Sequence, residues 1–123
     1  MTQEDKSLLL KDLCARLPYG VKVNGVFLNY NKDKDKILYE ECVKELDYSH
    51  LNRYETLKPY LFPLSSMTEE QSKVYHELIK GMFGTSALIN FEVLTDFFNS
   101  NHLDYRSLIK RGLAIDATGL NIY

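Results

Sequence analysis

The sequence contains no tryptophan, two cysteines and three prolines among its 123 residues. The two cysteines, Cys14 and Cys42, are too few for the disulfide framework of a small secreted domain, and they share no CxxC or other metal-binding spacing. We therefore expect a reduced protein in a reducing compartment. Cys14 follows Leu13 on an apolar helix face, so we expect its thiol to be buried.

Long hydrophobic runs are missing as well. Residues 1–6 are polar and of mixed charge, and the run Leu8-Leu9-Leu10 is too short for a signal sequence or a membrane span. We therefore expect a cytoplasmic protein without a membrane partner.

The chain has little excess of one charge. Its 15 Lys and Arg side chains stand against 17 Asp and Glu side chains, and no region is basic enough to form an electrostatic footprint for nucleic acid. Binding to nucleic acid is therefore not favoured, although the charge count does not exclude it.

Recognisable catalytic and metal-binding motifs are absent. The sequence has no GxSxG, Walker or GxGxxG pattern, and its histidines lie in no motif with a cysteine or serine. His76-Glu77 has no second histidine four residues away, and His102 with Asp104 is better explained as a surface histidine beside a capping aspartate. We assign no catalytic, cofactor-binding or metal-binding residue, and we expect neither a cofactor nor enzymatic activity.

The length and the 45% hydrophobic content favour one domain over residues 1–123, which should bury about two-thirds of the surface of its unfolded chain. The hydrophobic period divides it into residues 1–63, a helix plus antiparallel strands, and residues 64–123, which are mainly helical. The expected fold class is α+β.

The first expected helix covers residues 3–17. Thr2 can cap it, and Pro18 and Gly20 should end it. Apolar residues recur at helical spacing along one face, which are Leu9, Leu10, Leu13, Cys14 and Leu17.

Three short strands are expected next. Asn24-Gly25 lies between two β-branched runs and predicts a tight hairpin turn. Residues 31–36 predict a charged turn, after which a strand runs from Ile37 toward Val43. We expect a small, curved antiparallel sheet, with an SH3-like barrel as one form that it could take. Residues 57–63 carry two prolines, so we expect an edge strand or an extended connector there. Tyr60 and its apolar neighbours in that segment should be buried.

The second half reads as helices joined by short turns. Thr68 and Gln71 have the spacing of a capping box before a helix that should end near Gly81 and Gly84. We also expect the following elements: a short strand at 87–89, a helix capped by Asn90, a helix over 105–111 capped by Asp104, and a strand over 113–115.

Aromatic residues are the one unusual feature, with nine tyrosines and six phenylalanines. Many of the tyrosines lie in the strand half, where packing in the core is one explanation. A second is an exposed surface that binds a protein or another copy of the chain, and a third is a base-stacking platform. The candidate interaction surface consists of Tyr30, Tyr39, Tyr48 and Tyr54.

Three blocks of the sequence resemble a family of short uncharacterised proteins common in gut-bacterial genomes, prophages and mobile elements. They are KDLCARLPYGVKV at 11–23, KPYLFPLSSMTEE at 58–70 and DYRSLIKRGLA at 104–114. The resemblance implies a cytoplasmic accessory protein of phage or mobile-element origin. Over residues 24–56 the chain departs from the family pattern. It implies no catalytic chemistry.

Together these features predict a non-enzymatic accessory protein that acts through contacts with an unidentified protein partner or through self-association. The alternative is a small nucleic-acid-binding module that uses the strand half. An enzyme without a recognisable motif is the third reading.

Overall fold

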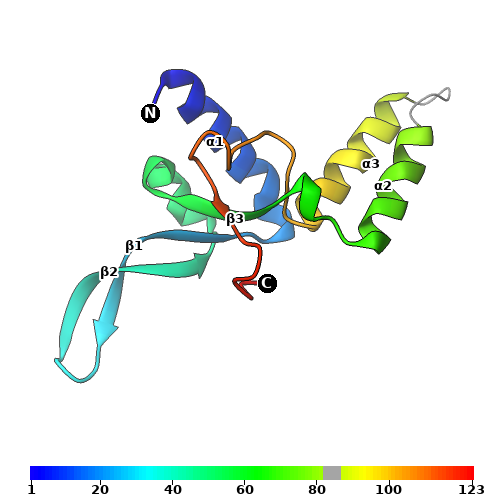
Figure 1. Cartoon of the computed structure of the whole chain (residues 1–123). Helices are drawn as coiled ribbons and strands as arrows, with labels where there is room; N and C mark the ends of the chain where they lie inside the picture. The colour runs from blue at the N-terminus through cyan, green and yellow to red at the C-terminus, as the bar shows by residue number, and fades with distance from the viewer. Residues whose placement is uncertain (82–86) are drawn as a thin grey trace.

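A computed structural model describes residues 1–81 and 87–123 and has an α+β fold, as the sequence predicts. Figure 1 shows α1 and β3 in a central body, with the paired strands β1 and β2 extending to one side and the helices α2 and α3 to the other. The helices and strands are α1 (Gln3–Arg16), β1 (Lys22–Asn31), β2 (Lys36–Glu45), β3 (Lys58–Pro63), α2 (Glu69–Gly81), α3 (Ala87–Ser100), β4 (Leu103–Asp104) and β5 (Ile115–Asp116). Three short 3-10 helices join them, η1 (Leu17–Tyr19), η2 (Tyr48–Thr56) and η3 (Leu64–Ser66).

Helix α1 begins and ends as its sequence predicts. The Thr2 side chain accepts the backbone N–H of Asp5 at 3.0 Å, and Gly20 adopts a φ of 78° directly after η1. The expectation that Cys14 is buried is wrong, because its side chain is exposed. The buried face of α1 consists of Leu9, Asp12, Leu13 and Arg16, so an ion pair shares this face with two of the predicted apolar side chains.

Strands β1 and β2 form one antiparallel ribbon, which pairs continuously from Lys22 with Glu45 to Asn31 with Lys36. The charged turn is confirmed at residues 32–35, but the turn predicted at Asn24-Gly25 is wrong because both residues lie inside β1. Gly25 serves a different purpose. A Cβ atom there would meet Cδ2 of Leu57 at 2.6 Å, so glycine allows the core side chain to approach the strand.

The sheet is mixed and open, with the strand order β2-β1-β3-β4 and β5 also paired with β3. The antiparallel sheet expected within residues 20–62 is confirmed, because β1 pairs in antiparallel with both β2 and β3. The parallel pairs join β3 to β4 and β5, which come from the second half of the chain. The edge position expected for β3 is wrong. Its prolines stand at the second and last positions, Pro59 and Pro63, and leave Tyr60–Phe62 free to pair.

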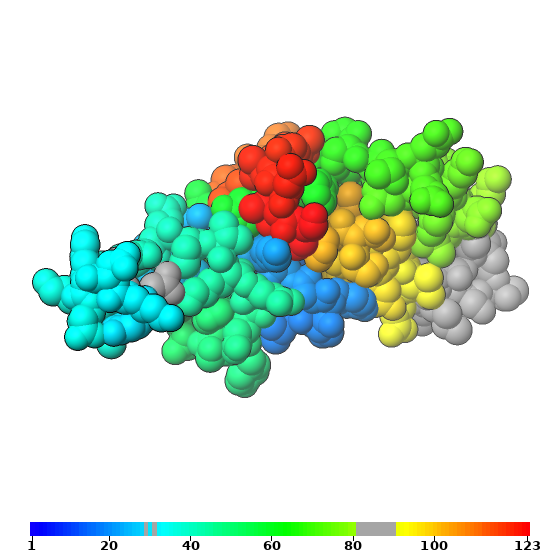
Figure 2. All heavy atoms as spheres, turned by 90° about the horizontal axis from the view of Figure 1, so that it is seen from below, coloured from blue at the N-terminus to red at the C-terminus, as the bar shows by residue number. Residues whose placement is uncertain are grey.

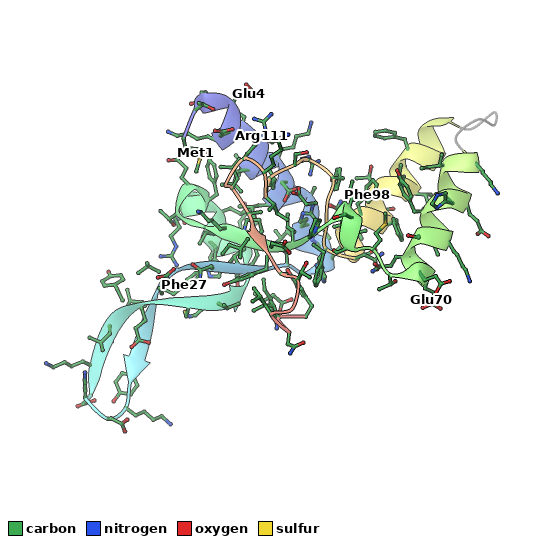
Figure 3. All side chains as sticks on the ribbon, viewed as in Figure 1. Met1, Glu4, Phe27, Glu70, Phe98 and Arg111 are labelled. Carbon is green, nitrogen blue, oxygen red and sulfur yellow. The ribbon has the colours of Figure 1, made fainter. Side chains whose placement is uncertain are left out.

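The main core lies between α1, the base of the ribbon, β3 and the segment that follows β4. Its buried members include Leu9, Leu13, Val23, Phe27, Leu57, Leu61, Leu108 and Leu113. A second cluster joins α3 to β4 through Leu94, Phe98 and Leu103, and Figure 3 labels Phe27 and Phe98 at these two places. Burial of these side chains in two clusters fixes the ribbon and the helical hairpin to one body.

In the second half, the capping box of α2 is confirmed. The N–H of Thr68 donates to Gln71 Oε1 at 2.9 Å, and the N–H of Gln71 donates to Thr68 Oγ1 at 3.1 Å. The predicted strand at 87–89 is wrong, and Asn90 is no cap, because α3 already begins at Ala87. A short apolar run does not distinguish a strand from a helix by its period. Gly84 lies outside the described residues.

The helix expected over 105–111 is also wrong, because these residues form turns. Ser107 adopts a φ of 59°, which an α-helix does not permit. The Asp104 carboxylate accepts the N–H groups of Leu108 and Ile109, both at 2.9 Å, so it caps a turn in place of a helix. The predicted strand at 113–115 is confirmed only at Ile115, where β5 begins.

The molecule is elongated. Figure 2 shows the turn of the ribbon at one end and the helical hairpin at the other, with the C-terminal residues on the middle of the body. Within residues 1–81 and 87–123, no helix has both the length and the apolar character that crossing a membrane requires.

Candidate functional site

The ribbon has two faces of different character. Side chains alternate along a strand, and directly opposed residues of an antiparallel pair share a face. Leu28 is opposite Tyr39, and Tyr30 is opposite Ile37, so these four side chains lie together. On the other face, Phe27 is buried in the core at the base of the ribbon.

The first face is exposed and mostly apolar, although Glu41, which is opposite Val26, is also exposed on it. We call it the apolar face of the ribbon; its members, with their exposed fractions, are Val26 (50%), Leu28 (49%), Tyr30 (58%), Ile37 (64%), Tyr39 (73%) and Val43 (39%). These fractions correspond to on the order of 600 Å² of apolar surface, whereas the largest patch on a typical monomer is about 300–600 Å². A patch of this size lies at the upper end of the range for monomers, and the largest patch of a monomer is often functional.

Two of the four candidate tyrosines belong to this face, Tyr30 and Tyr39. Tyr48 is 80% exposed but lies in η2, beyond the base of the ribbon, and Tyr54 is half-buried against the main core. The aliphatic members of the face were missed by the sequence analysis. Their signal was the alternation of Val26, Leu28 and Tyr30, which the expected turn at Asn24-Gly25 obscured.

The turn of the ribbon is held by a side-chain contact. The hydroxyl of Tyr30 donates a hydrogen bond to the Asp35 carboxylate, and this bond raises the pKa of Tyr30 above its ordinary value. Asp35 itself adopts a φ of 47° in the turn. The tyrosine ring is therefore oriented on the apolar face while its polar end is already paired.

The ribbon also has open edges. Strand β1 pairs with β3 only at Val23 and Asn24, and β2 is the terminal strand of the sheet order. Beyond Asn24, the described residues therefore supply no further strand to either edge. Unpaired backbone groups of this kind can accept an additional strand from another chain.

A second polar feature lies inside the molecule, between α1 and the segment after β4. The Asp12 carboxylate accepts two hydrogen bonds. One oxygen accepts Nε–H of Arg16 at 2.8 Å, and the other accepts Nη1–H of Arg106 at 2.8 Å. Arg16 and Asp12 are fully buried, and Nη2 of Arg16 donates to the Leu103 carbonyl at 2.7 Å. The ring of Tyr105 lies beside both guanidinium groups, at 5.4 Å from Cζ of Arg16 and 4.5 Å from Cζ of Arg106.

This network gives residues of two sequence blocks a structural role. The KDLCAR block supplies Asp12 and Arg16, and the DYR block supplies Tyr105 and Arg106. Their hydrogen bonds connect α1 to a segment 94 residues later in the chain. The network therefore stabilises the body, and we do not assign it a reaction.

His102 lies at the edge of this network. Its ring stacks on Tyr123 with 3.6 Å between ring centroids, and its Nδ1 has no hydrogen-bond partner among the described residues. Burial, followed by the positive charge of Arg16, lowers the pKa of His102 to about 4. Tyr123 in turn donates its hydroxyl to the Tyr60 carbonyl at 2.8 Å, and burial raises its pKa to about 12.

Acidification is expected to destabilise the protein through His102. Its pKa is about 4 in the folded protein and about 6.5 in an unfolded chain, so the unfolded chain binds the proton more tightly. Stability is fully present above pH 6.5 and falls as the pH drops toward 4. We expect His102 to contribute about 1–2 kcal/mol to this loss, a figure reduced because its ring is only half-buried.

Urea unfolding at pH 7 and pH 4.5 tests this. His102→Asn suits the comparison because asparagine tolerates the φ of 57° at this position and does not titrate. The variant should lose less stability than the wild-type protein between the two pH values, whereas His76→Asn, at an exposed site on α2, should behave like wild type. Equal losses in all three proteins would contradict the prediction.

Among the described residues, no group of three or more His, Cys, Asp or Glu side chains has the arrangement of a metal site. Several shallow pockets lie on the surface, including one of about 420 Å³ where η2 meets the ribbon. The apolar face of the ribbon remains the largest feature that the fold leaves unexplained. Comparisons with protein-family models, with curated proteins and with solved structures find no match for this chain.

Proposed function

We propose that this chain is a non-enzymatic accessory protein that acts through protein–protein contacts, with the apolar face of the ribbon as its contact surface. The observation that carries the proposal is the presence of six exposed apolar side chains, with Glu41 among them, on one face of a ribbon that projects from the body. Interfaces are distinguished by such apolar, aromatic centres, and tyrosine is among their most common anchors.

We further propose a phage or mobile-element origin and a cytoplasmic location. The support is the resemblance of the three sequence blocks at 11–23, 58–70 and 104–114. Two of these blocks supply the buried network around Asp12, so the resemblance concerns the body. Apart from Lys22 and Val23, the ribbon lies within residues 24–56, where the chain departs from the family pattern, and this location favours a partner that is particular to this protein.

The partner should present an extended segment with apolar side chains. An extended chain can pair with the open edge of β2 while its side chains cover Ile37, Tyr39 and Val43 on the apolar face. Lys36 and Glu45 at the two ends of β2 give the edge charges of both signs. Such charges suppress indiscriminate pairing of strand edges and favour one register.

Replacing Ile37 and Tyr39 together with threonine is expected to weaken partner binding at least tenfold, because loss of one well-buried anchor costs about 2 kcal/mol or more. Threonine keeps the β-branched preference for a strand. The tagged wild-type chain would capture the partner from cells that encode it, and titration calorimetry with the purified partner would compare the variants.

Tyr48→Ser is the matched control, since it removes an equally exposed tyrosine outside the ribbon. It should bind like wild type, and the unfolding midpoint of every variant should stay close to that of wild type. Binding that survives the double replacement would refute the apolar face as the contact surface. If the captured partner is nucleic acid, whose affinity falls steeply with salt, the alternative module is correct instead.

A further inference from the structure

The other face of the ribbon carries a cluster of cations where it meets η2. A pocket of about 420 Å³ opens there, and its lining includes Phe27, Lys44, Ser49, His50, Asn52 and Arg53. No Asp or Glu side chain is part of that lining. The pocket lies at the base of the ribbon, near Phe27 in Figure 3.

One buried ring holds the two permanent cations in place. Phe27 is 2% exposed, and its centroid lies 4.8 Å from Cζ of Arg53 and 5.2 Å from Nζ of Lys44. Cations at such distances are attracted to the electron-rich face of an aromatic ring. Lys44 comes from β2 and Arg53 from η2, so the ring positions cations from two different elements at one pocket.

These cations are not neutralised within the described chain. The salt bridges of the described residues involve neither Lys44 nor Arg53, and the one hydrogen bond of the Arg53 side chain goes from Nη1 to the Val26 carbonyl at 3.3 Å. The remaining guanidinium donors and the ammonium group are therefore available to an external acceptor.

His50 adds a donor to the same pocket. Its Nδ1 accepts the backbone N–H of Asp47 at 3.1 Å, so the neutral ring carries its proton on Nε2. The ring lies 5.0 Å from that of Phe27. The nearby carboxylate of Asp47 is occupied by the N–H of Ser49 at 2.8 Å, and Glu40, opposite Phe27 on β2, lies outside the pocket lining.

We infer that this pocket binds a phosphoryl group. A dianion with three terminal oxygens matches a guanidinium, an ammonium and an imidazole donor, with the Ser49 hydroxyl and the Asn52 amide beside them. The pocket also lies within the size range of ligand sites, about 300–1,000 Å³, which leaves space for the group that carries the phosphate. The pocket shares Leu28 with the apolar face of the ribbon, but its donors are other residues, so this inference does not depend on the proposed protein contact.

Titration of the full chain followed by ¹H–¹⁵N NMR tests the inference. Inorganic phosphate should cause saturable shifts of the amides of Ser49, His50 and Arg53, and sodium chloride of equal ionic strength should not. Lys44→Gln and Arg53→Gln should each weaken phosphate binding about tenfold, as expected for loss of a charge-assisted hydrogen bond. Lys44→Gln keeps the test valid if replacement of Arg53 disturbs η2.

A charge-matched control is Lys32→Gln with Lys36→Gln, which removes two cations near the turn of the ribbon. Its phosphate affinity should equal that of wild type. Adenosine monophosphate and a single-stranded oligothymidylate then distinguish a free phosphate monoester from a nucleic-acid backbone, with adenosine as the uncharged comparison. Shifts that do not saturate, or an equal loss of affinity in the control, would overturn the inference.

Discussion

Asp12→Ala is expected to lower the free energy of unfolding by about 3–5 kcal/mol, the loss typical when one partner of a buried ion pair is removed. Asp12 is the only acidic side chain bonded to Arg16 or Arg106 among the described residues. Without it, the guanidinium of Arg16 stays fully buried with its charge uncompensated. Chemical unfolding of the purified variant measures the change.

Asp5→Ala provides the comparison within the same helix. Asp5 pairs with Arg111 at 3.1 Å, but that pair is exposed, and solvent screening leaves such pairs little effect on stability. Replacing Asp12 with leucine and Arg16 with methionine should recover much of the stability that Asp12→Ala loses, because no unpaired carboxylate or Arg16 charge remains in that pair. A loss below about 1 kcal/mol for Asp12→Ala would mean that water reaches the network.

Local chemistry accounts for the parts of the fold that the sequence predicts well. The cap of α1 at Thr2, the capping box of Thr68 and Gln71 and the charged turn at 32–35 each depend on residues within four positions of one another. In the two caps, side chains satisfy backbone N–H groups that the first turn of any helix leaves without a partner. The surrounding structure therefore has little influence on them.

Contacts between distant segments account for the errors. From the sequence alone, Asp12 and Arg16 would be expected to face solvent. In the structure Arg106, from a segment 94 residues later, bonds to Asp12 and the pair is buried. Asn24-Gly25 has the sequence of a tight turn, but in the structure Leu57, which directly follows η2, packs against Gly25 within a continuous strand. Each pattern usually indicates a local structure, an exposed pair or a turn, and in this fold a tertiary contact determines the structure instead.

The candidate contact surface was only half predicted for the same reason. Tyrosine content pointed to the strand half, and Tyr30 and Tyr39 do lie on one exposed face. Which other side chains share that face depends on the register of β1 with β2. In the structure β1 and β2 are each ten residues long and pair along their whole length. The predicted turn divided β1 into two shorter strands, so this register could not be predicted.

Tyr60→Ala is expected to lower the free energy of unfolding by about 3 kcal/mol or more, as large truncations in a core do. Tyr60 is 7% exposed and belongs to β3, which lies between β1 and β4 in the sheet and also pairs with β5. Its hydroxyl accepts Nδ2 of Asn24 at 3.2 Å, so the side chain also connects β3 to β1. The Pro59–Pro63 segment is thus a structural strand, and a proline-rich ligand motif would have to be exposed.

Two further variants separate the contributions. Tyr60→Phe removes only the hydroxyl and should cost about 0.5–1.5 kcal/mol, the usual net value of one hydrogen bond. Tyr48→Ala truncates a tyrosine that is 80% exposed and should change stability by no more than about 0.5 kcal/mol. If thermal unfolding followed by circular dichroism placed Tyr60→Ala beside Tyr48→Ala, the central position of β3 would be wrong. A loss confined to the alanine variant would instead show that burial of the ring holds the two halves of the sheet together.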